Sequence, residues 1–254
     1  MSEPSVTRVD PHVKLLDEHV VSRAKRRGID ALVYAPHFTR LPEIRARAER
    51  FSDDELLVVP ARELFTGPWR SRKHVLALDL DAPVPDFLTF EGTLAELERQ
   101  DAVVLAPHPE FATVSVDVVD LNRNLELFDA VEVYNPKHRA AHNRRAREIS
   151  RTTGLPAFGS SYAHLRGTVG EVWTAFETAV DAPDDLHEAL RSGVPRRVFH
   201  RSGRAHRLRC GAEFAHLGWE NSAEKIDRVL LSSREATHPR HPAYGGRFDD
   251  VAVY

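Results

Sequence analysis

Short apolar runs alternate with amphipathic helical stretches along most of this chain, and this alternation limits its possible folds more than any other feature. Strands that alternate with helices are typical of βα units, in which neighbouring strands run parallel. The predicted strands are Thr7–Val13, Ala31–Ala35, Leu56–Pro60, His74–Leu78, Ala102–Ala106, Ala130–Tyr134 and Pro156–Gly159. Seven strands at this spacing predict an α/β fold whose sheet is a closed or nearly closed barrel.

The segments between these strands carry the helical pattern. The predicted helices are Asp17–Arg27, Leu41–Phe51, Leu94–Gln100, Val116–Leu127 and Ala140–Thr153. Gly154 follows the last of them, and glycine is the residue type most favoured directly after a helix end. A chain of 254 residues suits one large α/β domain, or one domain with a small appendage.

The pattern changes near residue 180. The elements predicted around and beyond this point are the strand Val172–Glu177, the short helix Asp184–Arg191, the strand Val198–His200 and a longer helix from Arg204 to about Ser233. The remaining residues are predicted to form a loop-like tail. We therefore predict a barrel over residues 1–180 and a mainly helical C-terminal appendage with a tail over residues 181–254.

The chain has one cysteine, Cys210, and 14 histidines. A lone cysteine excludes an intramolecular disulfide framework and thiolate-rich zinc sites, so any metal site must use imidazole and carboxylate ligands. The net charge of -3 gives no general attraction to nucleic acid or to an anionic membrane. The N-terminal residues form no apolar signal segment and no apolar run could span a bilayer, which predicts a cytoplasmic protein.

Polar side chains occur at or just after the ends of most predicted strands. They are Asp10, His12, His37, Glu63, His74, His108, Glu132, Asn135 and His164. Because the C-terminal ends of parallel barrel strands face one mouth, we expect these side chains to converge there. One histidine near a strand end is usually a hydrogen-bonded core residue. Five with a glutamate favour metal binding, because a divalent cation offsets the cost of clustering imidazoles.

Sequence motifs of several other enzyme classes are absent. The chain has no HExxH zinc motif, no GxSxG nucleophile elbow, no P-loop and no dinucleotide-binding fingerprint. Ser160 and Ser161 lie near His164, but without an elbow they give little support to a serine hydrolase.

The order of these motifs resembles the PHP family, named for polymerase and histidinol phosphatase. The segments that carry the resemblance are DPHVK (Asp10–Lys14), APH ending at His37, ARE ending at Glu63, HVL starting at His74, APHP with His108, and SSYAH (Ser160–His164). The resemblance covers about residues 7–178, and Glu188–Val198 resembles the region that often follows a PHP domain. It implies a distorted seven-stranded (β/α) TIM-like barrel, up to three metal ions (often zinc, manganese or iron) and hydrolysis of phosphoesters.

The resemblance also implies a set of metal ligands, with Glu63 as a bridging carboxylate. These ligands are His12, His37, Glu63, His74, His108 and His164. Lys14 stands where the family pattern has a second histidine, and Tyr162 stands where it has an aspartate. A further ligand stretch is shortened, which leaves Asp17 or His19 as candidate substitutes. The Glu63–His74–His108 site is complete, and we expect fewer than three metal ions per chain.

Lys14 has two interpretations that the sequence leaves open. Its ammonium group could take the place of the missing metal ion and bind a phosphate oxygen, which makes Lys14 and Glu63 the candidate catalytic residues. Alternatively, the site has decayed. Arg70, Arg72 and Lys137 would lie near the mouth and are candidate substrate-binding residues, although such basic side chains are as often simply solvated.

We therefore predict a divergent PHP-type metal-dependent hydrolase that acts on a small phosphorylated substrate, as a phosphatase or phosphodiesterase. The alternative is a catalytically degenerate PHP-like protein that binds nucleic acid or a protein partner. The basic segment Pro195–Arg209 supports the alternative. Nucleic acid is not favoured, because charge runs are usually solvated and only Phe199 offers an aromatic ring among these arginines.

Overall fold

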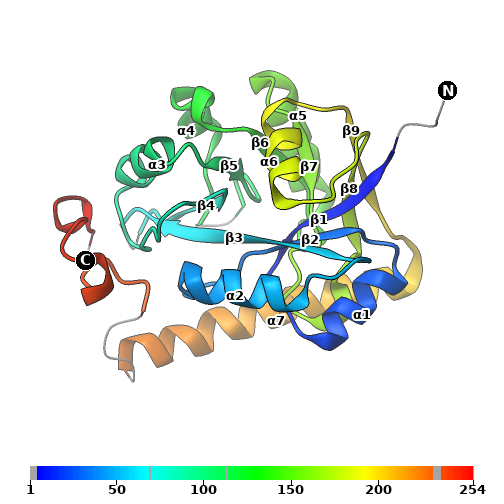
Figure 1. The fold of residues 1–254 in the computed structure, drawn as a ribbon, viewed down its shortest axis with the longest axis horizontal. Helices are drawn as coiled ribbons and strands as arrows, with labels where there is room; N and C mark the ends of the chain where they lie inside the picture. The colour runs from blue at the N-terminus through cyan, green and yellow to red at the C-terminus, as the bar shows by residue number, and fades with distance from the viewer. Residues whose placement is uncertain (1–4, 69, 112–113, 231–235, 254) are drawn as a thin grey trace.

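The computed structural model describes residues 5–68, 70–111, 114–230 and 236–253 (Figure 1). Its strands are β1 (Thr7–Val13), β2 (Ala31–Tyr34), β3 (Leu57–Thr66), β4 (Lys73–Leu78), β5 (Val103–Ala106), β6 (Ala130–Tyr134), β7 (Ala157–Gly159), β8 (Val172–Phe176) and β9 (Arg196–His200). Its α-helices are α1 (Glu18–Arg26), α2 (Leu41–Phe51), α3 (Phe90–Arg99), α4 (Val118–Arg123), α5 (Ala140–Thr153), α6 (Pro183–Arg191) and α7 (Gly203–Leu230). Short 3-10 helices are η1 (Leu125–Leu127), η2 (Arg166–Thr168), η3 (Pro242–Tyr244) and η4 (Asp249–Val251).

The nine described strands form a single sheet in the order β7-β6-β5-β4-β3-β2-β1-β8-β9. Strands β1 to β3 run parallel, as do β5 to β7, but β4 is antiparallel to both β3 and β5. Strand β8 is antiparallel to both β1 and β9. The α/β class is confirmed, whereas the prediction of seven barrel strands in a parallel arrangement is wrong in number and partly wrong in direction.

The connection from β3 to β4 explains one of these differences. Strand β3 continues to Thr66, well past the predicted end at Pro60, and β4 begins at Lys73. The short connection between them suits an antiparallel pair, because a parallel crossover needs a dozen residues or more. The chain therefore folds back after β3 to form the antiparallel strand β4. Glu63 lies in the part of β3 that pairs with β4.

The curved sheet is nearly closed by contacts between β7 and β8. The Gly159 amide donates a hydrogen bond to Thr174 Oγ1 (2.9 Å), and that hydroxyl donates to the Gly159 carbonyl oxygen (3.0 Å). A Cβ atom on Gly159 would lie 2.4 Å from Val198 Cγ1, so only glycine allows β9 to approach β7 this closely. The nearly closed barrel gives the ends of the strands a common mouth.

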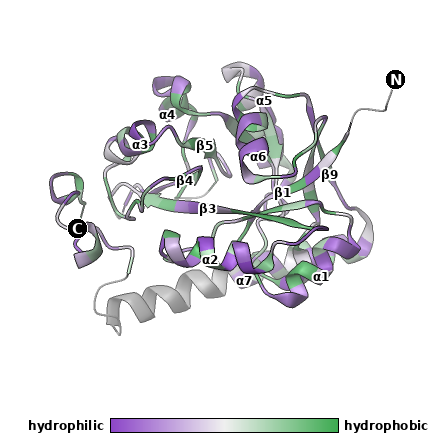
Figure 2. Ribbon diagram, in the orientation of Figure 1, coloured by the Kyte–Doolittle hydropathy of each residue, from purple (hydrophilic) through white to green (hydrophobic). Residues whose placement is uncertain are grey.

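The barrel interior is apolar, and α6 covers the end opposite the mouth. Leu186 and Leu190 of α6 pack in one buried cluster with Val9, Val59 and Phe158 from the strands. Two further clusters pack α1 and α2, and α3 and α4, against the outside of the sheet. In Figure 2 the helices around the sheet alternate between hydrophilic and hydrophobic residues, as expected for helices with one buried face.

The C-terminal part of the chain is attached through the buried carboxylate of Glu171. It accepts hydrogen bonds from Arg209 Nε (2.7 Å) of α7 and pairs with His206 Nδ1 (2.6 Å) and Arg27 Nη2 (2.6 Å). The helix predicted from Arg204 agrees with α7, and its predicted last residues, 231–233, lie outside the described residues. Strand β9 lies beyond residue 180 and still pairs within the sheet of the barrel. The domain boundary near residue 180 stays a prediction. No described helix is long and apolar enough to cross a bilayer.

Candidate metal centre

The six predicted metal ligands converge at one mouth of the barrel, around Glu63. Glu63 Oε1 lies 3.2 Å from His74 Nδ1 and 3.0 Å from His108 Nε2. Glu63 Oε2 lies 3.2 Å from His37 Nδ1 and 3.7 Å from His12 Nε2. The ring of His164 lies 5.8 Å from that of His37, between centroids. The sequence therefore identified a real cluster, with a single carboxylate at its centre.

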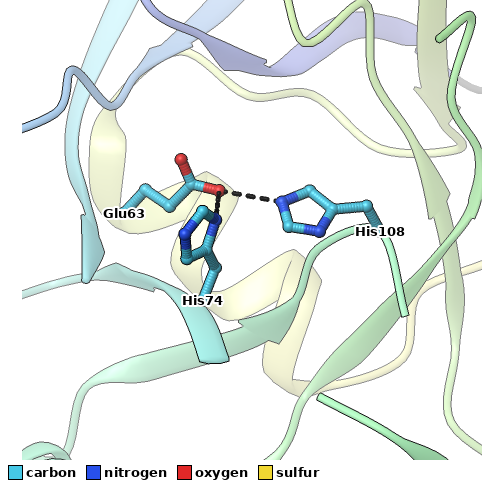
Figure 3. Close-up of side chains that lie close together, drawn as sticks. All are labelled: Glu63, His74 and His108. Carbon is cyan, nitrogen blue, oxygen red and sulfur yellow. Dashed lines mark hydrogen bonds and ion pairs between the residues drawn. The ribbon is translucent and has the colours of Figure 1, made fainter. Parts of the chain in front are cut away.

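The antiparallel pairing of β3 and β4 places Glu63 and His74 on the same face. Glu63 is paired with Leu76, and Phe65 with His74, so Glu63 and His74 are diagonal neighbours across the ladder. Figure 3 shows the two side chains meeting at one carboxylate oxygen, with His108 approaching from the other side. The ligand atoms of these three buried residues all lie within 4.8 Å of one another.

His108 is held in the orientation that a metal ligand needs. Its ring Nδ1 lies 3.2 Å from Ser115 Oγ, and that hydroxyl donates to the Phe111 carbonyl oxygen (2.6 Å). Because the hydroxyl proton is donated to this carbonyl oxygen, Ser115 Oγ acts as the acceptor of a hydrogen bond from an Nδ1–H group of His108. This leaves Nε2, which lies 3.0 Å from Glu63 Oε1, as the ring atom that could bind a cation through its lone pair. Sequence reasoning missed Ser115, because it lies in a loop without a motif.

The loop that carries His108 is fixed by Glu132. Glu132 Oε2 accepts hydrogen bonds from the His108 amide (2.7 Å) and from Asn135 Nδ2 (3.1 Å). Its other oxygen accepts from Ser160 Oγ (2.5 Å). Burial raises the pKa of Glu132 despite these donors. Glu132 and Asn135 were recognised as polar strand-end residues, and here they support the site. Ser160 contacts this carboxylate, which does not support a serine hydrolase.

The chemistry of the cluster fits a divalent cation. Both ring nitrogens of His12 and of His74 are buried and make no hydrogen bond with the described residues. Buried polar atoms without partners are costly, and a shared cation would satisfy them. Two ligand atoms on one tetrahedral zinc ion lie about 3.3 Å apart, which is close to the two distances at Glu63 Oε1.

The protonation states also suit metal binding. Burial, followed by the charge of Lys14, lowers the pKa of His12 to about 3 and holds that of His37 well below its usual range. Burial and the charges of Lys137 and Lys14 do the same to the pKa of His164. Burial alone would raise the pKa of Glu63, but Lys14 and the surrounding histidines hold it well below its ordinary value. Neutral imidazoles and an anionic carboxylate are the forms that bind metals.

Lys14 contacts the second carboxylate oxygen of Glu63. Its Nζ atom is paired with Glu63 Oε2 and donates a hydrogen bond to the Ala35 carbonyl oxygen (2.6 Å). The same Nζ lies 5.5 Å from the centroid of the Tyr162 ring. The two residues that depart from the family pattern are therefore neighbours. One half of the Glu63 carboxylate faces an ammonium group, and the other half faces His74 and His108.

Helix α7 contributes a buried glutamate, Glu213, that sequence reasoning missed. Glu213 Oε1 accepts hydrogen bonds from the amides of His164 (3.0 Å) and Leu165 (2.7 Å), and Oε2 lies 3.5 Å from Lys137 Nζ. Lys137 Nζ in turn lies 3.8 Å from the centroid of the Tyr162 ring. The helix predicted as part of an appendage thus reaches the mouth, a contact between distant segments that no local sequence pattern encodes.

The other predicted residues differ in their placement. Asp17 caps α1 by accepting from the Val20 amide (3.0 Å), and His19 is exposed. Arg72 is buried, with its guanidinium carbon 4.3 Å from the centroid of the Phe87 ring, whereas Arg70 is exposed. Asp17 therefore has a structural partner already, and the substrate-binding roles of Arg70, Arg72 and Lys137 stay predictions.

This fold and this site define a class of protein: an α/β barrel with a histidine-rich candidate metal site at its mouth. Residues 140–195 match the PHP-associated family model. The predicted resemblance to the PHP family is therefore confirmed.

Solved structures share the fold. PsfC from Pseudomonas syringae is 20% identical with a TM-score of 0.61, over 85% of this chain and 99% of that one. The lesion-specific endonuclease PfuEndoQ from Pyrococcus furiosus is 14% identical with a TM-score of 0.57, over 76% of this chain and 58% of that one.

A relative is also found by sequence. The uncharacterized protein MJ1587 from Methanocaldococcus jannaschii is 27% identical over 124 residues, which are 48% of this chain and 67% of that protein.

The contact between Ser115 and His108 yields a test of the metal centre. We expect Ser115→Ala to weaken metal binding by about 10- to 100-fold, because the His108 ring loses the partner that fixes its tautomer. Isothermal titration with Zn²⁺ or Mn²⁺ measures the change. Thr152→Ala, which alters an exposed hydroxyl on α5, is the matched control and should bind metal normally. Equal affinities in the two variants would contradict this role of Ser115.

Proposed function

We propose that this protein is a PHP-type metal-dependent hydrolase that acts on a phosphoester. The observation that carries the proposal is the buried group of Glu63, His74 and His108, whose ligand atoms lie within 4.8 Å of one another. Such a group at the mouth of a barrel is an arrangement that suits a catalytic metal site.

In this proposal, Glu63, His74 and His108 hold a divalent cation such as zinc, manganese or iron. A bound cation of this kind acts as a Lewis acid toward a phosphoryl oxygen and lowers the pKa of water. His12, His37 and His164 complete the polar lining of the mouth. With Lys14 paired to Glu63 Oε2, we expect fewer than three cations at the mouth, because the ammonium group would repel a cation bound to the same carboxylate oxygen.

Lys14 has the role of a fixed positive charge in this reaction. Its Nζ is held by Glu63 Oε2 and the Ala35 carbonyl oxygen, so the ammonium is positioned before substrate arrives. A phosphate oxygen that approaches the mouth would be neutralised by this group without any rearrangement. Lys137, whose Nζ is also buried at the mouth, is the second candidate to hold the phosphoryl group. Arg72 and Arg70 are the candidates on the β4 side.

A degenerate protein that binds nucleic acid is the second candidate function. One observation favours it: Phe199, which is 43% exposed, stacks on Trp173 with ring centroids 5.7 Å apart, next to the arginines of β9 and α7. Exposed aromatic rings beside arginines are typical of single-strand binding surfaces. One structure with the same fold is endonuclease Q in complex with a duplex that has an abasic lesion.

Metal analysis and turnover on the untagged protein test the proposal. We expect co-purified metal, and metal-dependent release of nitrophenol from nitrophenyl phosphate or from its bis ester, which separates phosphatase from phosphodiesterase activity. Glu63→Gln should be inactive. Salt-dependent binding of single-stranded DNA without hydrolysis of any of these substrates would favour the alternative and contradict the proposed hydrolase.

A further inference from the structure

A second group of side chains that could hold a metal ion lies at the opposite end of the barrel from the mouth. Asp79 follows the last residue of β4, and Asp184 and His187 belong to α6, which covers that end. His187 Nδ1 lies 3.3 Å from Asp79 Oδ1 and 3.8 Å from Asp184 Oδ1. The three ligand atoms all lie within 4.8 Å of one another. None of these residues contributes to the centre around Glu63.

His187 is buried without a hydrogen bond. Its side chain is 7% exposed, and among the described residues neither ring nitrogen has a hydrogen-bond partner. A polar ring in this state costs free energy unless something binds it. A protonated ring paired with the two carboxylates would be one solution. Burial opposes the protonated form of the ring, however. The effects of burial and of the Arg191 charge exceed those of Asp79 and Asp184, so the pKa of His187 is lowered.

The spacing of the three ligand atoms matches one small cation. Ligand atoms at zinc–nitrogen and zinc–oxygen distances of about 2.0–2.2 Å around a tetrahedral ion lie roughly 3.3–3.6 Å apart. The two distances from His187 Nδ1 are close to this range. Asp184 and His187 are three residues apart on one helix, so their side chains lie on the same face. Asp79 approaches this face from the end of β4.

Arg191 orients Asp79 for this role. Its Nη2 atom donates a hydrogen bond to Asp79 Oδ2 (3.0 Å), which leaves Oδ1 directed toward His187. Carboxylates that bind metals are themselves usually hydrogen-bonded by residues outside the ligand set. The positive charge of Arg191 weakens the attraction for a cation. With Asp79 and Asp184 ionised, the group nevertheless keeps a net negative charge.

We propose that Asp79, Asp184 and His187 bind a divalent cation of the zinc type, with water completing its coordination. The ion would join α6 to the end of β4 and so fasten part of the segment that matches the PHP-associated family to the barrel. It would stabilise the fold and take no part in hydrolysis at the mouth. The site goes beyond the proposed function and does not depend on it.

Asp184→Asn is the most direct test, because the Asp184 side chain is 96% exposed and its replacement leaves the packing intact. The matched control is Glu188→Gln, which removes the same charge from an exposed position of the same helix. Zinc is titrated into metal-stripped full-length protein and counted by native mass spectrometry, with phosphoesterase activity measured in parallel. We expect Asp184→Asn to bind one zinc ion fewer, or to bind it at least about tenfold more weakly, with unchanged activity.

Thermal melting of His187→Leu gives a second, independent measurement. If the site binds zinc, added zinc should raise the melting temperature of wild type more than that of His187→Leu. Equal zinc counts and affinities in Asp184→Asn and Glu188→Gln would overturn the proposal. So would an equal zinc-dependent rise in melting temperature in wild type and His187→Leu. An equal decrease in both helix variants would also overturn it, because that result reflects general surface charge.

Discussion

Replacing Glu63 with glutamine should remove metal from the barrel mouth and destabilise the metal-free protein by about 3–5 kcal/mol, the usual cost of leaving one partner of a buried ion pair alone. Glu63 is fully buried, and the side chain of its partner Lys14 is 6% exposed. The amide cannot neutralise that ammonium group. Nor can it supply the anionic ligand that faces His74 and His108.

The pH dependence of this effect has a definite sign. Lys14 and the histidines hold the pKa of Glu63 below its ordinary value of 4.5, so its ionised form stabilises the folded state. That stabilisation is fully present above pH 4.5 and is lost as the pH falls through the lowered pKa. The difference in stability between wild type and Glu63→Gln should therefore be large at neutral pH and should shrink in acid.

Urea unfolding of the metal-free proteins, together with metal counting, measures both effects. Glu132→Gln is the matched control, since Glu132 is also buried at the mouth but has neutral hydrogen-bond donors instead of an ammonium group. Its loss of stability should be clearly smaller. Unchanged metal content and an unchanged unfolding free energy in Glu63→Gln would contradict the central position assigned to this carboxylate.

Local features of the sequence predicted individual elements well. Strands β1 and β6 and helices α2 and α5 begin and end at the predicted residues. Helices α2 and α5 each have an apolar face at helical spacing, and a glycine directly follows α5. The end of β3 was missed, because Ala61–Thr66 continues a strand in which charged Arg62 and Glu63 are buried. Buried charges interrupt the hydrophobic pattern from which strands are recognised.

The candidate site was predictable where it depended on strand ends and not where it depended on distant pairing. All six expected ligands lie at the mouth, because each follows or belongs to a strand of the barrel. Ser115 and Glu213 could not be identified, since their roles arise from a loop and a helix that fold back onto the strands. The antiparallel direction of β4 is also a tertiary property, yet it places His74 beside Glu63.

Lys14 decides whether the departure from the family pattern preserves activity. We expect wild type to bind fewer than three metal ions at the mouth, because the ammonium group occupies the side of Glu63 that a further ion would need. Lys14→Ala should then keep metal at Glu63, His74 and His108 but lower kcat for phosphoester hydrolysis by about 10²–10³-fold, as loss of one preorganised charged group does. Lys25→Ala, which breaks an exposed ion pair with Asp53, is the matched control and should keep full activity.

The double variant Lys14→His with Tyr162→Asp tests whether metal binding at this position can be restored. It restores both ligand types of the family pattern around Glu63, and we expect it to bind at least one more metal ion than wild type. Metal counting by mass spectrometry and steady-state kinetics on one phosphoester distinguish the outcomes. Three bound ions at the mouth of wild type would show that Lys14 does not exclude a metal. If wild type is inactive and Lys14→Ala changes nothing, the site has decayed. A positive charge that replaces a metal ion in catalysis must lower the rate of hydrolysis when it is removed.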